Sequence, residues 1–380
     1  MILFNVKGSE NWLVRHFLSF FKQTLYSIST HACTMNLSTE QSSSEKMLID
    51  GFEGGTAVAC VILGLSFLVG APGNLLVIWT ILRHVKQRSH TVVLILHLAN
   101  ADLLVLITLP VWIYALANSW VFGEAFCKAL VYVMSVCMFS SIFFITLMSI
   151  ERFLALCHPF LMMRWMTKSV MNRCLVLLWI LALILGLPSL LTHPESKATN
   201  ECFIKEFSSV TQAIVLFSLE TFVGFVVPFI ILSICYCQVA AQLRTMSLSS
   251  KQKSMRLVHT VVIAFIFCWL PYHVINIFDM FCILRPGTDH ECVPEGVVFS
   301  SGALVFISSS VNPVLYVFFA RSLRGSLEES RLVRLFQEMV THTTKMRELV
   351  VQHQSSQMAA ERSDVQLCEK NQCHRDVVEM

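Results

Sequence analysis

The chain has 380 residues, of which 55% are hydrophobic and 14% are charged, with a formal net charge of +3. Soluble domains carry charge on about a quarter of their residues, so the composition argues against a soluble globular protein. The 14 cysteines include no CxxC pair, and no His or Cys cluster has the spacing of metal ligands. We therefore expect a membrane protein, and neither a disulfide scaffold nor a zinc protein.

Seven apolar segments are long enough to cross a bilayer, which takes about 20 helical residues. They are expected at 56–82, 91–117, 125–157, 171–191, 209–243, 257–282 and 295–319. The predicted fold is an all-α membrane protein, with a seven-transmembrane helix bundle at 56–319. Lys and Arg are concentrated in the first, third and fifth loops, which places these loops in the cytoplasm. The N-terminus is then extracellular and the C-terminus cytoplasmic.

The two ends of the chain differ in character from the spans. Residues 1–55 are expected to form an extracellular tail, in which Asn36 begins the one N-glycosylation sequon. The part before Met35 is interpreted as an irregular leader or as residues absent from the mature chain. Basic and apolar side chains alternate at helical spacing over 320–336, which predicts a short amphipathic helix on the inner membrane surface. Residues 337–380 are expected to form a cytoplasmic tail.

Three ionisable side chains lie inside or at the end of apolar spans. Asp102 falls in the middle of the second span, and Glu151 and Arg152 fall at the inner end of the third. Charged groups are costly in a bilayer, so these side chains should face the bundle interior and find partners there. For Arg152 the plainer reading is a long side chain that reaches the aqueous boundary.

The sixth and seventh spans contain features that favour a bundle able to change shape. Pro271 and Pro313 lie within these spans, and proline frees backbone carbonyls and allows a helix to bend. Trp269 follows Phe265 by four residues, so both side chains lie on the same side of the sixth span. Outside the spans, Cys127 and Cys202 lie beside predicted outer loops, where disulfides persist.

These residues resemble the rhodopsin-like (class A) G-protein-coupled receptors over about 56–336. The resemblance rests on motifs that occur in the expected order on the expected spans. The motifs are Gly73-Asn74, Leu98-Ala99-Asn100-Ala101-Asp102, Trp120-Val121-Phe122-Gly123, Glu151-Arg152-Phe153, Cys268-Trp269-Leu270-Pro271 and Asn312-Pro313-Val314-Leu315-Tyr316. The resemblance implies a receptor of the plasma membrane that signals through heterotrimeric G proteins, with arrestin, a receptor kinase and membrane lipids as further partners. No nucleic-acid partner and no enzymatic activity are expected.

The resemblance assigns roles to particular residues. It implies an allosteric sodium ion, the only cofactor expected, at a site formed by Asp102, Ser141, Asn312 and Asn74. The alternative for these four is a polar network that only ties helices together.

It further implies a switch for G-protein activation and an outer disulfide. The switch residues are Glu151, Arg152, Tyr236, Tyr316, Phe265 and Pro271. The disulfide joins Cys127 to Cys202. A second bridge between Cys282 and Cys292 remains open, because Cys282 is equally suited to burial at a helix end.

Within the family, the chain most resembles leukotriene B4 receptors. The segments that carry this resemblance include Ser218-Leu219-Glu220-Thr221-Phe222 and Trp269-Leu270-Pro271-Tyr272-His273-Val274-Ile275-Asn276. A buried carboxylate at Glu220 suits the two hydroxyls of leukotriene B4, although pairing of Glu220 with His273 or with water is the plainer reading. The expected ligand-binding residues are Glu220, His273, Asn276, Tyr132, Met138, Trp269 and His193.

One departure concerns the carboxylate of such a ligand. Leukotriene B4 receptors carry an Arg at the outer end of the fourth span, where this chain has His193. Lys197 and Lys205 are the other substitutes that the sequence offers. A related oxidised fatty acid is therefore an alternative ligand.

Other classes of protein were weighed against the lipid receptor. A peptide-chemoattractant receptor of the same family is the main alternative, although the outer loops are sparse in charge. A seven-span transporter is disfavoured because no inverted repeat with broken helices is visible. A retinal pump is disfavoured because 295–319 contains no Lys for a Schiff base.

Overall fold

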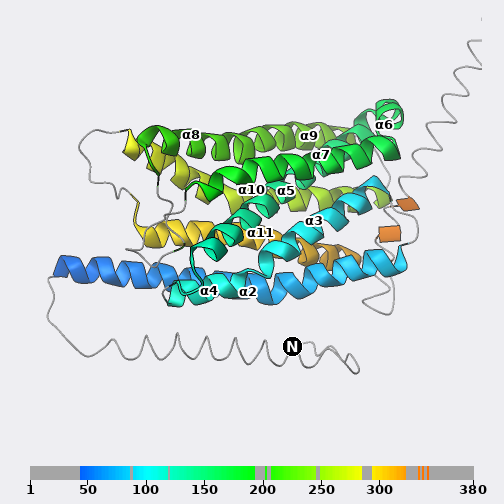
Figure 1. Ribbon diagram of the computed structural model, residues 1–380. Helices are drawn as coiled ribbons and strands as arrows, with labels where there is room; N and C mark the ends of the chain where they lie inside the picture. Colours follow the sequence, from blue (N-terminus) through cyan, green and yellow to red (C-terminus); the bar gives the residue numbers. More distant parts are fainter. Residues whose placement is uncertain are drawn as a thin grey trace, which may run out of the picture.

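The computed structural model describes residues 43–85, 89–118, 120–192, 202, 207–244, 249–284 and 293–321, together with residues 333, 336, 337, 340 and 341. Seven helical segments in this part of the chain are long and apolar enough to cross a membrane, which confirms the predicted fold class. These segments are Gly55–His84, His90–Ala117, Glu124–Ala155, Lys168–Leu190, Val210–Val239, Val262–Ile283 and Gly296–Tyr316. Figure 1 shows them as one bundle of roughly aligned rods.

The first helix, α2 (Ser43–His84), begins well before the expected start at residue 56. Its early part therefore belongs to the segment that was expected to be an irregular tail. The expected Asn36 sequon lies outside the described residues.

The second span is broken, although the sequence predicts one continuous helix. It forms α3 (His90–Leu106) and α4 (Leu109–Ala117), and Pro110 lies in the first turn of α4. Proline cannot donate a backbone hydrogen bond, so the helical ladder is interrupted before it. Thr108 at the break donates its hydroxyl to the carbonyl of Val105, at 2.7 Å.

The fifth span also departs from a regular helix. It consists of α8 (Val210–Thr221), a single π-helical turn η2 (Phe222–Val226) and α9 (Val227–Arg244). Pro228 lies just after this turn and has no N–H to offer to the preceding carbonyls. Wide turns of this kind re-aim the side chains that follow and are frequent at functional sites.

The remaining helices agree closely with the predicted spans. They are α5 (Glu124–Cys157), α7 (Lys168–Gly186) with a 3-10 turn η1 (Leu187–Leu190), α10 (Ser249–Ile283) and α11 (Glu295–Arg321). A short helix α6 (Pro159–Trp165) follows α5. Of the amphipathic helix expected at 320–336, all but a few residues lie outside the described ones.

Helix α5 crosses the middle of the bundle, where it packs against α3, α7 and α9 (Figure 1). Helix α2 packs against α11 and α3 on one side, and α10 packs against α11.

We call the end that holds Cys127 the disulfide end, and the opposite end, which faces right in Figure 1, the Arg152 end. The functional residues lie between these two ends.

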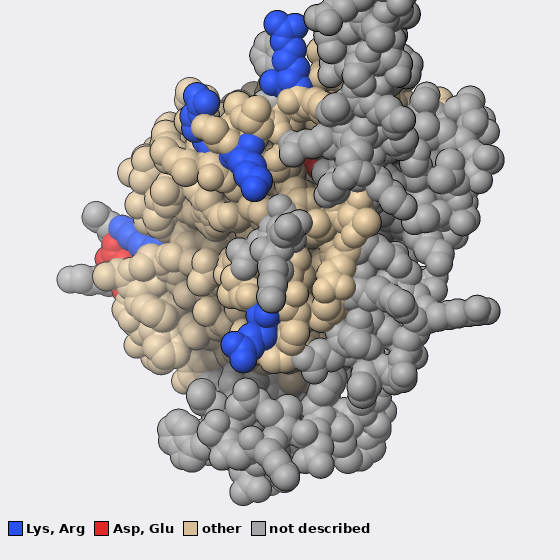
Figure 2. Space-filling view, turned by 90° about the vertical axis from the view of Figure 1, so that its right-hand side faces the viewer, with Lys and Arg blue, Asp and Glu red and all other residues tan. Residues whose placement is uncertain are grey.

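The Arg152 end carries exposed basic side chains. Figure 2 views the bundle from this end and shows Lys and Arg spread around a largely uncharged surface. The described residues with exposed basic side chains here are Arg83, Arg164, Lys168 and Arg173. Among the side chains that the structure describes at this end, the acidic one is Glu151, which is fully buried.

Two glycines allow α2 to lie close to its neighbours. A Cβ atom added at Gly73 would lie 2.7 Å from Cγ of Pro313, and one added at Gly70 would lie 2.7 Å from Cβ of Ser310. Both distances are well below normal van der Waals contact, and the proline ring is rigid. The close packing of α2 on α11 therefore requires a residue without a side chain at these positions.

We predict that Gly73→Ala destabilises the protein by about 1–3 kcal/mol, because the added methyl group overpacks the contact with Pro313. The matched control is Gly302→Ala on α11, where an added Cβ meets no atom within 4 Å. The control should be neutral or slightly stabilising because alanine favours a helix. Thermal unfolding in detergent micelles measures both effects, and equal melting temperatures for the two variants would contradict the prediction.

Candidate ligand and signalling sites

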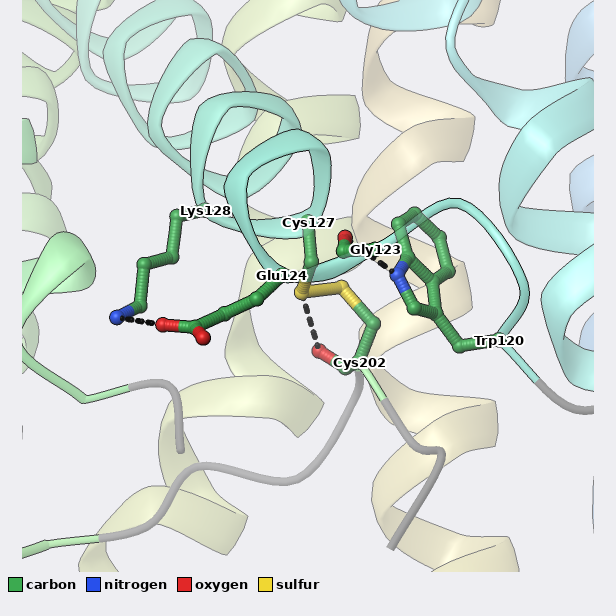
Figure 3. Close-up of polar contacts among 6 residues, drawn as sticks. All are labelled: Trp120, Gly123, Glu124, Cys127, Lys128 and Cys202. Atoms are coloured by element: carbon green, nitrogen blue, oxygen red, sulfur yellow. Dashed lines mark hydrogen bonds and ion pairs between the residues drawn. A yellow bond between two sulfur atoms is a disulfide. The ribbon is translucent and has the colours of Figure 1, made fainter. Parts of the chain in front are cut away.

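At the disulfide end, Cys127 at the start of α5 is joined to Cys202, with their Cα atoms 5.8 Å apart (Figure 3). Beside it, Trp120 donates its indole N–H to the carbonyl of Gly123, at 2.8 Å. Gly123 has a φ of 81°, a conformation that favours glycine. The turn and the disulfide together fix how the chain enters α5.

The second bridge proposed at this end is described only in part. Cys282, at the end of α10, is disulfide-bonded. Cys292 lies outside the described residues, as do His193, Lys197 and Lys205. None of the three expected outer cations can therefore be placed, and the charged side chains that are described at this end are on the helices.

The centre of the bundle contains a buried carboxylate, Asp102 on α3, which is 1% exposed. Ser141 on α5 donates its hydroxyl to Oδ1 at 2.9 Å, and Asn312 on α11 donates its amide to Oδ2 at 2.8 Å. Each carboxylate oxygen thus accepts a hydrogen bond from a different helix. Three helices that are distant in sequence meet at this one side chain.

Asn74 on α2 lies fully buried but uses its amide differently from Asn312. Its N–H₂ group donates to the backbone carbonyls of Gly70 and Ser309, both at 3.0 Å. Its side-chain oxygen is buried and has no hydrogen-bond partner. Asn74 therefore ties α2 to α11 and leaves one acceptor available.

At the other end of α5, Glu151 and Arg152 are 0% and 4% exposed. Oε2 of Glu151 lies 3.5 Å from Nε of Arg152 and accepts a hydrogen bond from the hydroxyl of Thr91 on α3, at 2.8 Å. Nη2 of Arg152 is buried without a hydrogen-bond partner. This burial does not fit the plainer reading in which Arg152 simply reaches water, and the guanidinium keeps capacity to bind another acceptor.

The two switch tyrosines are in opposite environments. Tyr316 on α11 is 1% exposed, and its hydroxyl is buried without a hydrogen-bond partner. Its ring lies 6.3 Å from that of Phe336. Tyr236 on α9 is 39% exposed. A hydroxyl buried without a partner is costly, so Tyr316 would gain from an arrangement that brings it an acceptor.

A column of rings runs along α10 from the switch to the fifth span. Phe265 and Trp269 have centroids 5.6 Å apart, Trp269 stacks on His273 at 5.8 Å, and His273 stacks on Phe225 of η2 at 4.9 Å. Nδ1 of His273 also lies 3.4 Å from the hydroxyl oxygen of Thr221. Pro271 lies within this part of α10. The wide turn η2 and the bend-prone part of α10 are thus in direct contact.

Glu220 on α8 has a partner that the sequence does not predict. The hydroxyl of Tyr272 on α10 donates to Oε1 of Glu220, at 2.6 Å, and both side chains are half-buried. Tyr272 precedes His273, so this bond joins the acid to the ring column. The sequence offers one hint of this bond. Tyr272 lies in the half of the sixth span that is expected to be outer, and a tyrosine hydroxyl can donate to an acid nearby.

The other expected ligand residues are distributed around this pair. Asn276 is 5% exposed, and its side-chain nitrogen has no hydrogen-bond partner, like the indole nitrogen of Trp269. Tyr132 on α5 donates its hydroxyl to the carbonyl of Leu183 on α7, at 3.2 Å. Met138, further along α5, packs in the bundle core. Buried donors on α10 and apolar groups on α5 are suited to an elongated, mainly apolar ligand with few polar groups.

These observations describe a helical membrane protein with seven segments of spanning length, in which a polar pair and a ring column are joined and a buried arginine lies toward one end. Comparison with known families agrees, because the model of the 7 transmembrane receptor (rhodopsin family) matches residues 73–316. The chain belongs to this family, which consists of receptors and not of enzymes.

The individual relatives within this family belong to two named groups of receptors. Leukotriene B4 receptor 1 of Bos taurus is 33% identical over 296 residues, which are 76% of this chain and 84% of the relative. Leukotriene B4 receptor 2 of Homo sapiens is 35% identical over 298 residues, 74% of this chain and 81% of the relative. Atypical chemokine receptor 3 of Canis lupus familiaris is 35% identical over 276 residues, 69% and 75% of the two chains. The resemblance to leukotriene B4 receptors is confirmed, with a second group of relatives beside them.

We predict that Thr91→Ala raises ligand-independent G-protein activation by several-fold. The hydroxyl of Thr91 holds the acid beside Arg152, and hydrogen bonds to charged groups contribute about 1.5–3 kcal/mol. Thr91→Ser, which keeps the hydroxyl, is the matched control and should behave as the wild type. G-protein dissociation in cells without ligand measures the effect, and equal basal activity of all three proteins at equal surface expression would refute it.

Proposed function

We propose that this protein is a receptor for a lipid chemoattractant, with leukotriene B4 or a related oxidised fatty acid as its agonist. The observation that carries the proposal is the Glu220–Tyr272 pair, a carboxylate and a hydroxyl held at 2.6 Å beside the stacked rings of His273 and Trp269. A carboxylate accepts hydrogen bonds from the hydroxyls of such a lipid, and aromatic walls accept its chain. The names of two groups of relatives support the same ligand.

The ligand acts by exchanging partners at this pair. A hydroxyl of the lipid donates to Glu220 and takes the place of the Tyr272 hydroxyl, which releases the outer part of α10. Movement of Tyr272 is passed to His273 and Trp269, since these rings are stacked. Binding then favours a second arrangement of α10, bent at Pro271, because the ligand has more affinity for that arrangement.

At the Arg152 end, this second arrangement separates Arg152 from Glu151 and presents the guanidinium to a heterotrimeric G protein. Arg152 has an unused buried donor for this contact, and Tyr236 and Tyr316 move inward beside it. Coupling is to inhibitory-type G proteins, in line with leukotriene receptors. Arrestin and a receptor kinase then act on the cytoplasmic tail at 337–380.

The same proposal orients the chain in the plasma membrane. The disulfide end is extracellular, with residues 1–55 and a glycan at Asn36 outside. The Arg152 end is cytoplasmic, with the amphipathic helix at 320–336 on the inner membrane surface. The exposed basic side chains at the Arg152 end support this orientation.

The residues around Asp102 are suited to a sodium ion. Hard cations bind oxygen atoms, and this part of the bundle contains the Asp102 carboxylate, the Ser141 hydroxyl and the unpaired side-chain oxygen of Asn74. When bound, the ion supplies a positive charge that offsets the buried carboxylate. Asn312 then holds the second oxygen of Asp102 in place.

A peptide-chemoattractant receptor is the second candidate, because atypical chemokine receptor 3 is as similar as the leukotriene receptors. Recognition of a charged peptide requires many charged side chains at the outer end. Among the side chains that the structure describes there, the charged ones are Glu124, Lys128, Glu220 and Asp279. The small number of charged groups among these described side chains favours the lipid.

The first test is a leukotriene B4 dose–response in cells that express the full chain, with G-protein dissociation as the readout. A saturable response absent from untransfected cells is expected. Arg152→Ala should abolish this response while surface expression persists, because it removes the group that contacts the G protein. Full signalling by Arg152→Ala would overturn the proposed mechanism.

A second test addresses the ligand site. Glu220→Gln should raise the ligand concentration for half-maximal response by about 10- to 100-fold, as expected for loss of one or two charge-assisted hydrogen bonds. Glu124→Gln, which removes a carboxylate outside the proposed site, is the matched control and should leave the dose curve in place. Identical curves for Glu220→Gln and the wild type would remove Glu220 from the ligand site.

A further inference from the structure

A lysine that the sequence does not single out lies beside the outer disulfide. Lys128 follows Cys127 on α5 and forms an ion pair with Glu124 one turn earlier. Figure 3 shows both side chains on the opposite side of the disulfide from Trp120. The Lys128 side chain is 26% exposed, so it is accessible to solvent at the disulfide end of the bundle.

Lys128 is distinguished by where the other basic groups lie. Among residues with described side chains, the other Lys and Arg are at the Arg152 end: Arg83, Arg152, Arg164, Lys168 and Arg173. The cations expected at the outer end from the sequence, on loops, lie outside the described residues. Lys128 differs from them because it is held on a membrane-spanning helix, in a defined position next to the disulfide.

The face of α5 that carries Lys128 continues toward the end of α7. Tyr132 lies one helical turn further along and donates its hydroxyl to the carbonyl of Leu183. Its ring would lie 3.2 Å from a Cβ added at Gly186, so the small residue allows close approach. Lys128 therefore lies one helical turn from the contact between α5 and the end of α7, on the side toward the disulfide.

The existing ion pair does not prevent Lys128 from binding a ligand. Pairs four residues apart on a helix contribute little when exposed, and Glu124 is 50% exposed. An ammonium group has three donors, so it can hold Glu124 and a second carboxylate together.

We propose that Lys128 binds the carboxylate of the agonist, while Glu220 and Tyr272 bind its hydroxyls; this inference rests on the proposed lipid function. An oxidised fatty acid has its acid at one end and hydroxyls along the chain. The Lys128 cation at the disulfide end matches the acid, and the Glu220 carboxylate on α8 matches the hydroxyls. The cation is supplied by α5, so the missing Arg at the end of the fourth span does not leave the acid unpaired.

The test combines removal of the Lys128 charge from the protein with removal of the carboxylate charge from the ligand. Wild type and Lys128→Gln are each given leukotriene B4 and its methyl ester, which lacks the negative charge, and G-protein dissociation is measured. On the wild type, the ester should need about 10- to 100-fold more ligand than the acid. Lys128→Gln should shift the acid by a similar factor but leave the ester nearly unchanged, because coupled groups give non-additive effects.

Two control variants separate charge from structure. Lys128→Arg keeps the cation and should retain most of the response to the acid. Glu124→Gln removes the partner but not the cation, and should leave the preference for the acid over the ester intact. Surface expression of every variant is measured through a tag in the same cells.

Each remaining result counts against the proposal in a distinguishable way. If Lys128→Gln responds as the wild type, or if its response to acid and ester is weakened by the same factor, the carboxylate binds elsewhere while leukotriene B4 remains the agonist. If Lys128→Arg loses the response as Lys128→Gln does, the cation is not what the site needs. If the wild type does not respond to leukotriene B4 at all, the proposed ligand is wrong and the assignment of Lys128 falls with it.

Discussion

Asp102 places the strongest constraint on the bundle, because a carboxylate buried in an apolar interior must be satisfied by groups that the protein itself provides. Its two oxygens accept hydrogen bonds from Ser141 and Asn312, which come from α5 and α11. These bonds fix the rotation and register of three helices relative to one another. Asn312 precedes Pro313, and Gly73 of α2 packs against that proline.

Two elements with weakened helical hydrogen bonding touch inside the bundle: the wide turn η2 and the proline-containing part of α10. The wide turn η2 and the proline of α10 meet at the stacked rings of Phe225 and His273. A regular helix resists bending. A helix that contains a proline or a wide turn bends more easily and can adopt alternative arrangements of similar energy. A ligand that binds beside these interruptions can therefore shift the whole bundle with a few hydrogen bonds. The unsatisfied hydroxyl of Tyr316 and the spare donor of Arg152 show that the described arrangement leaves polar groups ready for other partners.

At the disulfide end, two pairs of polar side chains stand out among the described residues. Lys128 pairs with Glu124 near the start of α5, and Tyr272 bonds to Glu220 and so joins α10 to α8. Both pairs are within reach of solvent or ligand, so their partners can be exchanged at low cost, unlike the fully buried contacts of Asp102. This contrast separates groups that hold the bundle together from groups that the proposed function assigns to ligand recognition.

The sequence by itself determined the number of spans, their approximate limits and the residues that needed polar partners inside the membrane. These follow from local properties, because length and apolarity decide whether a segment can span and a buried charge demands a partner wherever it occurs. Partners from other helices were not predictable in the same way. Thr91, Tyr272 and the position of Lys128 depend on the relative rotation of helices, which a single sequence does not encode locally. Only the tertiary structure decided these contacts, and it alone showed that Pro110 breaks the second span and that the fifth span widens at Phe222–Val226, because the cost of a broken helical ladder is offset by packing against neighbouring helices.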